Sequence, residues 1–330
     1  MNNVLLRMIL GLGLLQSSMV LAGGAQPLRI EGASALQPLM QAAGDGFRHE
    51  QPGVGIEVTV GGSGGGLMRL CHGNTDIVAT TRPMRKDELE ACAKAHIEFI
   101  ELPLALDAVT VVINSGNNFV KSLSVDDLRK IWDISAKGRI QKWNEINSSW
   151  PDWPLTLLAP DGQSDEGGYF NAAILGNRPV RTDVMVSGED DVLIRGVARS
   201  SYTLSYVAFG DYWRHHHQLK AVPIAPAEGA AAVTPSPETI ADGSYRPLTR
   251  PLFLYVAVAS LKKPSASDYL AFLLRHAAHY AKALDYVPLQ EAAYQRGLER
   301  LRQGIKGSVW NGTIPVGLTV VELQKKYGLL

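Results

Sequence analysis

A glycine-rich turn between an apolar strand and a helix constrains this chain more than any other segment. The strand Val58–Val60 runs into Gly61–Gly66, and Leu67–Leu70 then supplies the apolar positions of a helix. Because glycine lacks a Cβ, backbone N–H groups can face a ligand there, and the helix N-terminus favours negative charge. The spacing matches neither a P-loop nor a dinucleotide-binding turn. The segment therefore predicts an anion site, with Ser63 as an added hydroxyl donor.

The first residues of the chain indicate export. Residues 1–22 combine an early Arg7 with an apolar core and the small-residue cleavage site Val20-Leu21-Ala22. They are predicted to be a signal peptide. An uncleaved anchor is the alternative, but Gln16-Ser17-Ser18 breaks the apolar run and leaves it short for a membrane span. We expect the mature chain in the periplasm, without membrane insertion.

Composition limits the classes of partner. The chain has 330 residues, of which 46% are hydrophobic, and 32 basic side chains balance 32 acidic ones. This hydrophobic fraction is ample for two packed lobes. A near-neutral balance argues against nucleic acid as a partner, although a local basic pocket remains compatible with it.

Two cysteines, Cys71 and Cys92, are the only ones in the chain. In an exported protein they are predicted to form a disulfide, which would tie the helix after the glycine turn to a helix around Lys86–Ala95. Two free thiols are the alternative. A zinc pair is disfavoured because no histidine is suitably spaced around them.

Neither a catalytic group nor a metal or cofactor site is predicted. Ser164 lacks the G-x-S-x-G elbow of a hydrolase, and Asp190-Asp191 fits a helix cap better than an acid/base pair. His215–His217 is the only histidine cluster, but consecutive histidines point in different directions and rarely meet one metal. The chain is therefore not expected to be an enzyme.

Strand-like and helix-like patterns alternate along the chain, which predicts an α/β fold. The first three strands, at Leu28–Ile30, Gly55–Val60 and Ile77–Ala79, alternate with helices in the order βαβαβ. The other predicted elements are a helix at Ala35–Phe47, a strand at Leu106–Ile113, a helix at Val125–Ile131 capped by Ser124, a strand at Leu155–Leu158, a helix at Tyr169–Ile174, a loop at Ala230–Gly243, a strand at Leu252–Val258, and helices at Ala266–Ala283, Leu289–Arg302 and Val320–Tyr327.

Five motifs follow one another in a recognisable order. They are EGASALQPL at Glu31–Leu39, GGSGGGLMRLCHGNTDIVATTRPM ending at Met84, LRKIWD at Leu128–Asp133, TPSPETIADGSYRPLTRPLFLYV at Thr234–Val256 and YVPL at Tyr286–Leu289. Together they resemble the phosphate-binding proteins of bacterial ABC transporters, the PstS-like family. The resemblance extends over essentially the whole mature chain.

This resemblance implies a two-lobed type II periplasmic binding protein fold with two hinge-crossing strands. Lobe I would combine residues 26–106 with 251–330, and lobe II would span residues 107–250. The hinge strands would be Leu106–Ile113 and Leu252–Val258. The implied function is capture of phosphate or another small oxyanion between the lobes and its delivery to an ABC permease.

The resemblance also places ligand contacts in lobe I. The implied contacts are Ser34 with the N–H groups of Ala35 and Leu36, then Ser63, Gly64 and Gly65, and finally Arg82. The planar guanidinium of Arg82 suits two oxygens of a tetrahedral anion. Alternatives stay open: Ser34 as a plain N-cap, the glycines as a structural turn, and Arg82 in an ion pair with Asp76, Glu88 or another carboxylate.

Lobe II departs from the family pattern at the matching helix start. Relatives usually carry Asp-Ser-Gly-Thr, whereas this chain has Gln163-Ser164-Asp165-Glu166 and keeps only Ser164. Each carboxylate would oppose an anion ~4 Å away by ~4 kcal/mol at an effective dielectric constant near 20. Three hypotheses follow. Both acids point to solvent, a carboxylate binds a protonated oxyanion or a cationic or neutral ligand, or the fold serves as an interaction or sensor module without the phosphate site.

Overall fold

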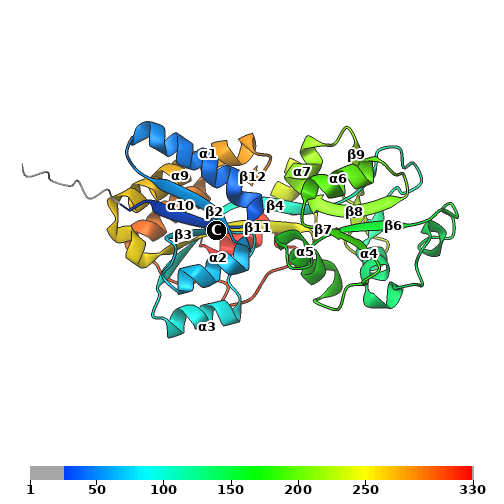
Figure 1. The fold of residues 1–330 in the computed structure, drawn as a ribbon, viewed down its shortest axis with the longest axis horizontal. Helices are drawn as coiled ribbons and strands as arrows, with labels where there is room; N and C mark the ends of the chain where they lie inside the picture. The colour runs from blue at the N-terminus through cyan, green and yellow to red at the C-terminus, as the bar shows by residue number, and fades with distance from the viewer. Residues whose placement is uncertain (1–25, 329–330) are drawn as a thin grey trace, which may run out of the picture.

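The computed structural model describes residues 26–328, in which two α/β lobes lie side by side (Figure 1). This confirms the predicted α/β class with two lobes. The predicted signal peptide, residues 1–22, lies outside the described residues. Within residues 26–328 there is no helix whose length and apolar character would let it cross a membrane.

Strands from both lobes form one long sheet. Its strands are β1 (Leu28–Gly32), β2 (Ile56–Val60), β3 (Ile77–Thr80), β4 (Phe99–Asn114), β6 (Thr156–Pro160), β7 (Met185–Ser187), β8 (Thr203–Ala208), β9 (Leu219–Ala221), β11 (Thr249–Ala257) and β12 (Val287–Pro288). The short strands β5 (Leu123–Ser124) and β10 (Ile224–Ala225) pair separately.

Helices cover the sheet in both lobes. The α-helices are α1 (Gln37–Glu50), α2 (Gly62–Cys71), α3 (Lys86–Lys94), α4 (Val125–Trp132), α5 (Asp165–Phe170), α6 (Asp190–Ala198), α7 (Phe209–Arg214), α8 (Pro237–Ala241), α9 (Pro264–Ala283), α10 (Glu291–Gln303) and α11 (Val320–Lys326). The 3₁₀ turns are η1 (Ser34–Leu36), η2 (Ile134–Ala136), η3 (Trp143–Glu145) and η5 (Val258–Lys262), and η4 (Asn171–Leu175) is a π-helix that continues α5.

Two strands, β4 and β11, run from one lobe into the other (Figure 1). The order across the sheet is β2-β1-β3-β11-β4-β8-β6-β7. β4 pairs with β11 up to Ala108 and with β8 from Val109 onward. At the crossing, Asp107 lies directly opposite Arg250. The lobe boundaries given above, which fall at this crossing, stay a prediction.

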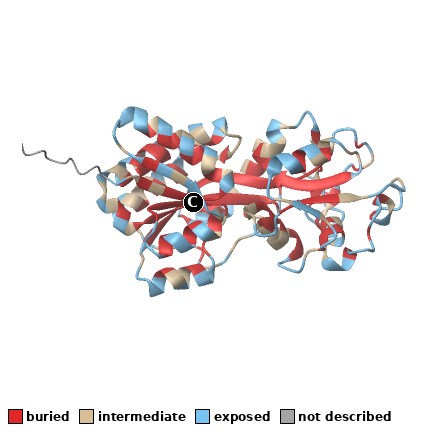
Figure 2. Ribbon diagram, in the orientation of Figure 1, coloured by how far each residue is buried: buried red, intermediate tan, exposed pale blue. Residues whose placement is uncertain are grey.

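The buried residues follow the sheet through both lobes (Figure 2). All nine residues of β11 are buried, as are the first 15 of the 16 residues of β4. In lobe I, α1 packs through Leu39, Met40, Ala43 and Phe47, which recur at helical spacing. The hinge strands are therefore part of a continuous core rather than exposed connections.

Several element boundaries differ from the sequence prediction. β4 begins at Phe99 rather than Leu106, because Glu101 and Pro103 interrupt the apolar pattern although both are buried in the strand. The predicted loop Ala230–Gly243 contains the short helix α8, which Ser236 caps. Helix α5 begins at Asp165 rather than Tyr169 because Ser164 caps it.

Candidate functional site

The turns of lobe I meet at one edge of the sheet because β1, β2 and β3 are parallel. Gly32, at the end of β1, lies opposite Val60 of β2 and Ala79 of β3. A Cβ on Gly32 would lie 1.9 Å from the Ala79 carbonyl oxygen, so only glycine allows this approach. Ligands of open α/β sheets bind at such carboxyl edges.

Helix α2 presents its N-terminus at this edge. It begins at Gly62, so the glycine turn forms the first turn of the helix rather than preceding it. The N-cap residue of α2 is Gly61, which has no side chain that could accept a hydrogen bond from the first-turn amides. Amide groups of the first turn, including those of Ser63 and Gly64, therefore have no intrahelical acceptor. A Cβ on Gly61 would lie 2.3 Å from Glu31 Oε1, which explains glycine there.

A cavity of about 780 Å³ lies between α2 of lobe I and the start of α5 in lobe II. Its lining comes from both lobes: Ser34, Gly61, Gly62, Ser63, Gly64, Gly65, Thr81, Arg82, Arg85, Gly162, Gln163, Ser164, Asp165, Gly168, Tyr169, Ala172, Asn177, Ile314 and Val316. The two helix N-termini that the sequence singled out thus face one shared space.

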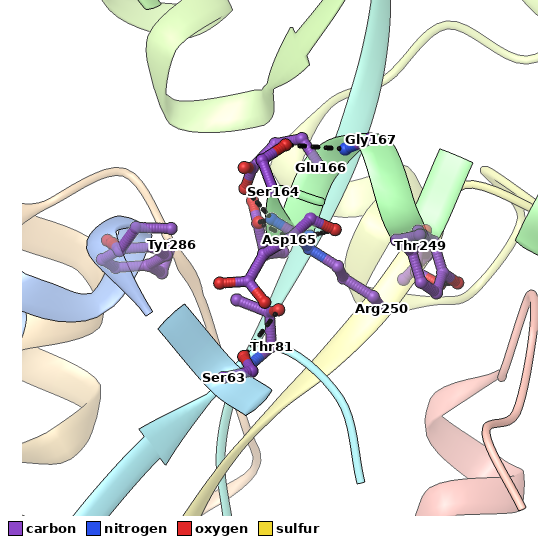
Figure 3. Close-up of polar contacts among 12 residues, drawn as sticks. Ser63, Thr81, Ser164, Asp165, Glu166, Gly167, Thr249, Arg250 and Tyr286 are labelled. Carbon is purple, nitrogen blue, oxygen red and sulfur yellow. Dashed lines mark hydrogen bonds and ion pairs between the residues drawn. The ribbon is translucent and has the colours of Figure 1, made fainter. Parts of the chain in front are cut away.

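A serine hydroxyl is held in the same way in each lobe (Figure 3). Ser63 Oγ accepts a hydrogen bond from the Thr81 N–H at 3.1 Å, and Ser164 Oγ accepts one from the Gly167 N–H at 3.1 Å. Ser63 Oγ also lies 3.3 Å from Thr81 Oγ1, where either atom can donate. Each serine oxygen accepts a hydrogen bond from a backbone N–H. The hydroxyl proton of each serine therefore remains available to an acceptor in the cavity.

Arg82 lines the cavity while pairing with Glu88 behind it. Its Nη1 and Nη2 donate to the two Glu88 carboxylate oxygens at 2.8 and 2.6 Å, and Nη1 also donates to the Pro83 carbonyl. Burial lowers the pKa of Arg82, but the hydrogen bond and charge of Glu88 outweigh it and raise the pKa. A guanidinium has five N–H donors, so two have no partner among residues 26–328.

The ion pair that the sequence left open for Arg82 is therefore with Glu88. Asp76, the other candidate, accepts hydrogen bonds from Ser260 at 2.6 Å and from Lys263 at 2.9 and 3.0 Å. The missing side chain of Gly64 leaves room for Arg82 beside the α2 turn, because a Cβ there would make a tight contact, 3.3 Å, with Arg82 Nη2.

Glu166 does not point into solvent, which corrects one sequence hypothesis. Its side chain is buried, and Oε1 accepts a hydrogen bond from Arg250 Nη2 at 2.6 Å. Arg250 also donates to Asp107 Oδ2 at 2.8 and 3.0 Å and to the Asp165 carbonyl at 3.0 Å. Burial disfavours the charge of Arg250, but Asp107 and Glu166 outweigh it and raise its pKa. The charge of Glu166 is thus compensated from the hinge strand β11.

Asp165 is the acidic group that remains in the cavity. Figure 3 shows its carboxylate directed from α5 toward the side where Ser63 and Thr81 lie. Its charge helps to raise the pKa of Arg82, behind the larger effects of burial, which lowers it, and of Glu88. The site therefore combines helix N-termini, hydroxyl donors and an arginine with one carboxylate acceptor.

The other residues predicted to contact the ligand do not all line this cavity. Ser34, Gly64, Gly65 and Gln163 line it. Ala35 and Glu166 instead line a neighbouring cavity of about 350 Å³. Leu36 is buried and donates its N–H to the Ala33 carbonyl at 3.1 Å, so it has no N–H left for a ligand.

The predicted disulfide is confirmed and supports the lobe I turn. Cys71, the last residue of α2, is bonded to Cys92 of α3. The loop that it closes contains both Arg82 and Glu88. The disulfide therefore ties the C-terminal end of α2 to α3 and encloses the Arg82–Glu88 pair within one covalent ring.

Sequence reasoning missed the residues that act across long separations. Arg250 is fully buried and separated from Glu166 by 84 positions, and Asp107 lies on the other hinge strand. Tyr169 OH donates to the Thr249 carbonyl at 2.5 Å and thereby ties α5 to β11. One signal was present: an arginine within an apolar strand is rarely buried unless it is paired.

Known proteins and a family model match most of the length of this chain. The PBP superfamily domain matches residues 21–276. Protein SphX of Synechocystis sp. is 36% identical over 304 residues, which cover 92% of this chain and 90% of that protein. The phosphate-binding protein PstS of Staphylococcus haemolyticus is 30% identical over 279 residues, covering 84% of this chain and 86% of that protein.

Solved structures share the fold. A structure described as a possible phosphate binding protein from Planctomyces limnophilus superposes with a TM-score of 0.67 at 30% identity, covering 85% of this chain and 99% of that one. An ABC-type phosphate transport receptor from Vibrio cholerae gives a TM-score of 0.64 at 20% identity, covering 79% and 99%, and is similar in fold alone.

Proposed function

The chain belongs to the PBP superfamily, and we propose that it is a solute-binding protein that captures phosphate or a similar small oxyanion between its lobes. The observation that carries this proposal is that α2 and α5 direct their N-termini into one cavity from opposite lobes. Helix N-termini favour anions because their amide groups are unpaired and the helix dipole is positive there. The names of the PstS and Planctomyces relatives support phosphate as the anion.

Each lobe contributes a different part of the proposed anion site. Lobe I offers the α2 amides, the Ser63 hydroxyl and the two uncommitted N–H groups of Arg82, while lobe II offers the Ser164 hydroxyl and the start of α5. A bound anion would bridge the lobes and shift an open-closed equilibrium toward the closed state. Affinity then depends on contacts from both lobes.

Asp165 would accept a hydrogen bond from a protonated oxyanion. A carboxylate beside a fully deprotonated anion only repels it, whereas hydrogen phosphate can donate its remaining proton. Of the hypotheses that the sequence left open for this loop, this assignment of Asp165 fits its position in the cavity. The site would therefore prefer phosphate or arsenate to sulfate.

The proposed cellular role follows that of the relatives. After removal of residues 1–22, the protein would act in the periplasm and deliver its ligand to an ABC permease. The named PstS relatives are binding proteins, and we propose that this chain likewise performs no catalysis and needs no cofactor.

Calorimetric titration tests this proposal. The mature protein, stripped of ligand by unfolding and refolding, is titrated with phosphate, arsenate, sulfate and molybdate. We expect phosphate to bind, and Arg82→Ala to weaken it by about tenfold to hundredfold, since a hydrogen bond to a charged group contributes about 1.5–3 kcal/mol.

Arg69→Ala is the matched control. Arg69 lies on α2, whose first turn lines the cavity, but its own side chain is 59% exposed, pairs with Glu31 and does not line the cavity. No heat with any oxyanion, together with no compaction in small-angle scattering, would favour an interaction or sensor module instead.

A further inference from the structure

The cavity extends well beyond the end that the anion would occupy. Ser164, Gly168 and Ala172, spaced four residues apart, all line it and therefore mark one face of α5 and its continuation η4. At 1.5 Å per residue, this face is about 12 Å long. Because this face belongs to a single helical segment, closure of the lobes would narrow the cavity but leave the length of the face unchanged.

One wall of the cavity is apolar. Ile314 and Val316, from the segment between α10 and α11, line it, and Val316 is 41% exposed there. The segment is held at both ends, by α3 at Gly312 and by α5 at Gly317. A Cβ on Gly312 would lie 2.9 Å from the backbone nitrogen of Lys86 in α3, and Gly317 donates its N–H to Tyr169 OH at 3.3 Å.

An inorganic oxyanion uses neither the length of the cavity nor its apolar wall. A tetrahedral anion has five heavy atoms, whereas cavities of about 300–1,000 Å³ hold ligands of drug size. Apolar side chains cannot donate to an anion, but they gain free energy when an apolar group covers them. The site therefore offers a polar half and an apolar half to a single ligand.

We propose that the physiological ligand class of this site is a phosphate monoester or phosphonate with a small apolar substituent. This inference rests on the proposed oxyanion function. The phosphoryl group lies between the N-termini of α2 and α5, and the substituent lies along Gly168 and Ala172 against Ile314 and Val316. The ligand binds as the monoanion, whose P–OH donates to Asp165.

Titration at pH 5.5 with phenyl phosphate and with inorganic phosphate tests the ligand class. At this pH a monoester with a second pKa of about 6 is mostly monoanionic. We expect phenyl phosphate to bind about tenfold more tightly, as burial of two CH₂ equivalents would give. Inorganic phosphate binding as tightly or more tightly overturns the inference but leaves the proposed function intact. Binding of neither compound removes both.

Two pairs of variants locate the substituent. Gly168→Leu would fill the cavity along this face, since among residues 26–328 a Cβ there would meet only the Gly162 carbonyl, at 4.0 Å. The ratio of phenyl phosphate to phosphate affinity is expected to fall at least tenfold. Gly188→Leu is the control, because Gly188 is outside the cavity and a Cβ there would meet no described atom within 4 Å.

Val316→Ser should lower the same ratio severalfold. Its control is Val321→Ser, because Val321 is 48% exposed on α11 and does not line the cavity. If neither Gly168→Leu nor Val316→Ser changes the ratio relative to its control, the substituent does not lie on this wall and the inference is wrong.

Discussion

Each lobe has a buried arginine–glutamate pair beside the cavity, but the arginine lies nearer the cavity in lobe I and farther from it in lobe II. In lobe I, Arg82 faces the cavity with a side chain 11% exposed, and Glu88 lies behind it. In lobe II, Arg250 lies behind with no exposure and pairs with Glu166, while Asp165 lines the cavity in front of it. Both halves place the same charges near a helix N-terminus, yet lobe I presents a cation and lobe II an acid.

This difference separates attraction from selection. Lobe I, with α2 amides and Arg82, would attract any oxyanion, since these groups are donors that serve protonated and deprotonated ligands alike. Lobe II adds Asp165, which in the proposed site would accept a hydrogen bond and so favour a ligand that still carries a proton. The lobe that departs from the family pattern in the sequence is thus the one that we propose to discriminate between ligands.

The largest expected effect comes from removing the rear arginine of lobe II. Arg250→Met leaves Asp107 and Glu166 buried without their cation, which should cost about 3–5 kcal/mol of unfolding free energy. Urea denaturation followed by circular dichroism measures it. Adding Glu166→Gln should recover part of the loss, because it removes one stranded charge.

Arg69→Met is the control for this change. Its ion pair with Glu31 is exposed on the arginine side, so the cost should stay within about 1 kcal/mol. If Arg250→Met does not fold, Arg250→Lys keeps the charge and should fold with a smaller loss. A loss below 1 kcal/mol for Arg250→Met would mean that the cluster does not support the lobe II half-site.

The disulfide gives lobe I a covalent support that lobe II lacks, since the chain has only two cysteines. Cys71→Ala with Cys92→Ala opens a loop with a sequence separation of 21, and should cost about 3 kcal/mol in the same urea experiment. Reduction of the wild-type protein should give a similar loss. If both treatments change stability by less than about 1 kcal/mol, the folded contacts of α2 and α3 suffice by themselves.

Local chemistry made much of lobe I predictable from the sequence. The glycine run, the small number of cysteines and the strand–turn–helix order concern residues within about 35 positions of one another, and parallel strands necessarily bring their ends to one edge. The family resemblance implied a ligand contact at Leu36, but the Leu36 N–H donates to the Ala33 carbonyl instead. Whether a turn amide is free depends on its hydrogen bond, which residue types do not reveal.

Lobe II could not be predicted in this way because its charge is balanced from a distance. Asp165 and Glu166 adjoin in the sequence, yet one faces the cavity and the other meets Arg250, 84 positions away from Glu166. Only the register of β4 against β11 places Arg250 opposite Asp107. Strand β4 was also underestimated, because its buried Glu101 resembles an exposed residue in the sequence and is satisfied by Tyr255 and Tyr327.

A smaller effect is expected when the selecting group is neutralised. Asp165→Asn removes the negative charge that would repel sulfate, and it replaces the carboxylate that would accept a hydrogen bond from a protonated ligand by a neutral amide. The preference for phosphate over sulfate should therefore fall about tenfold. Competitive titration at pH 6 measures the ratio. Asp161→Asn is the control, because Asp161 is exposed at the same turn but does not line the cavity. An unchanged ratio would assign discrimination to another group.

The smallest effects compare the two serines. Ser63→Ala removes the acceptor of the buried Thr81 N–H, and Ser164→Ala removes that of the Gly167 N–H. Ser63 and Thr81 are 1% and 2% exposed, so the Thr81 N–H would lose its acceptor in a buried position, and we expect a loss near 1 kcal/mol of unfolding free energy. Ser164 is only half-buried and lines the cavity, so water can occupy the space that its hydroxyl leaves, and about 0.5 kcal/mol is expected. Urea denaturation of both variants measures these losses. A larger loss for Ser164→Ala than for Ser63→Ala would show that the α5 cap, rather than the α2 turn, is the more tightly held half of the site.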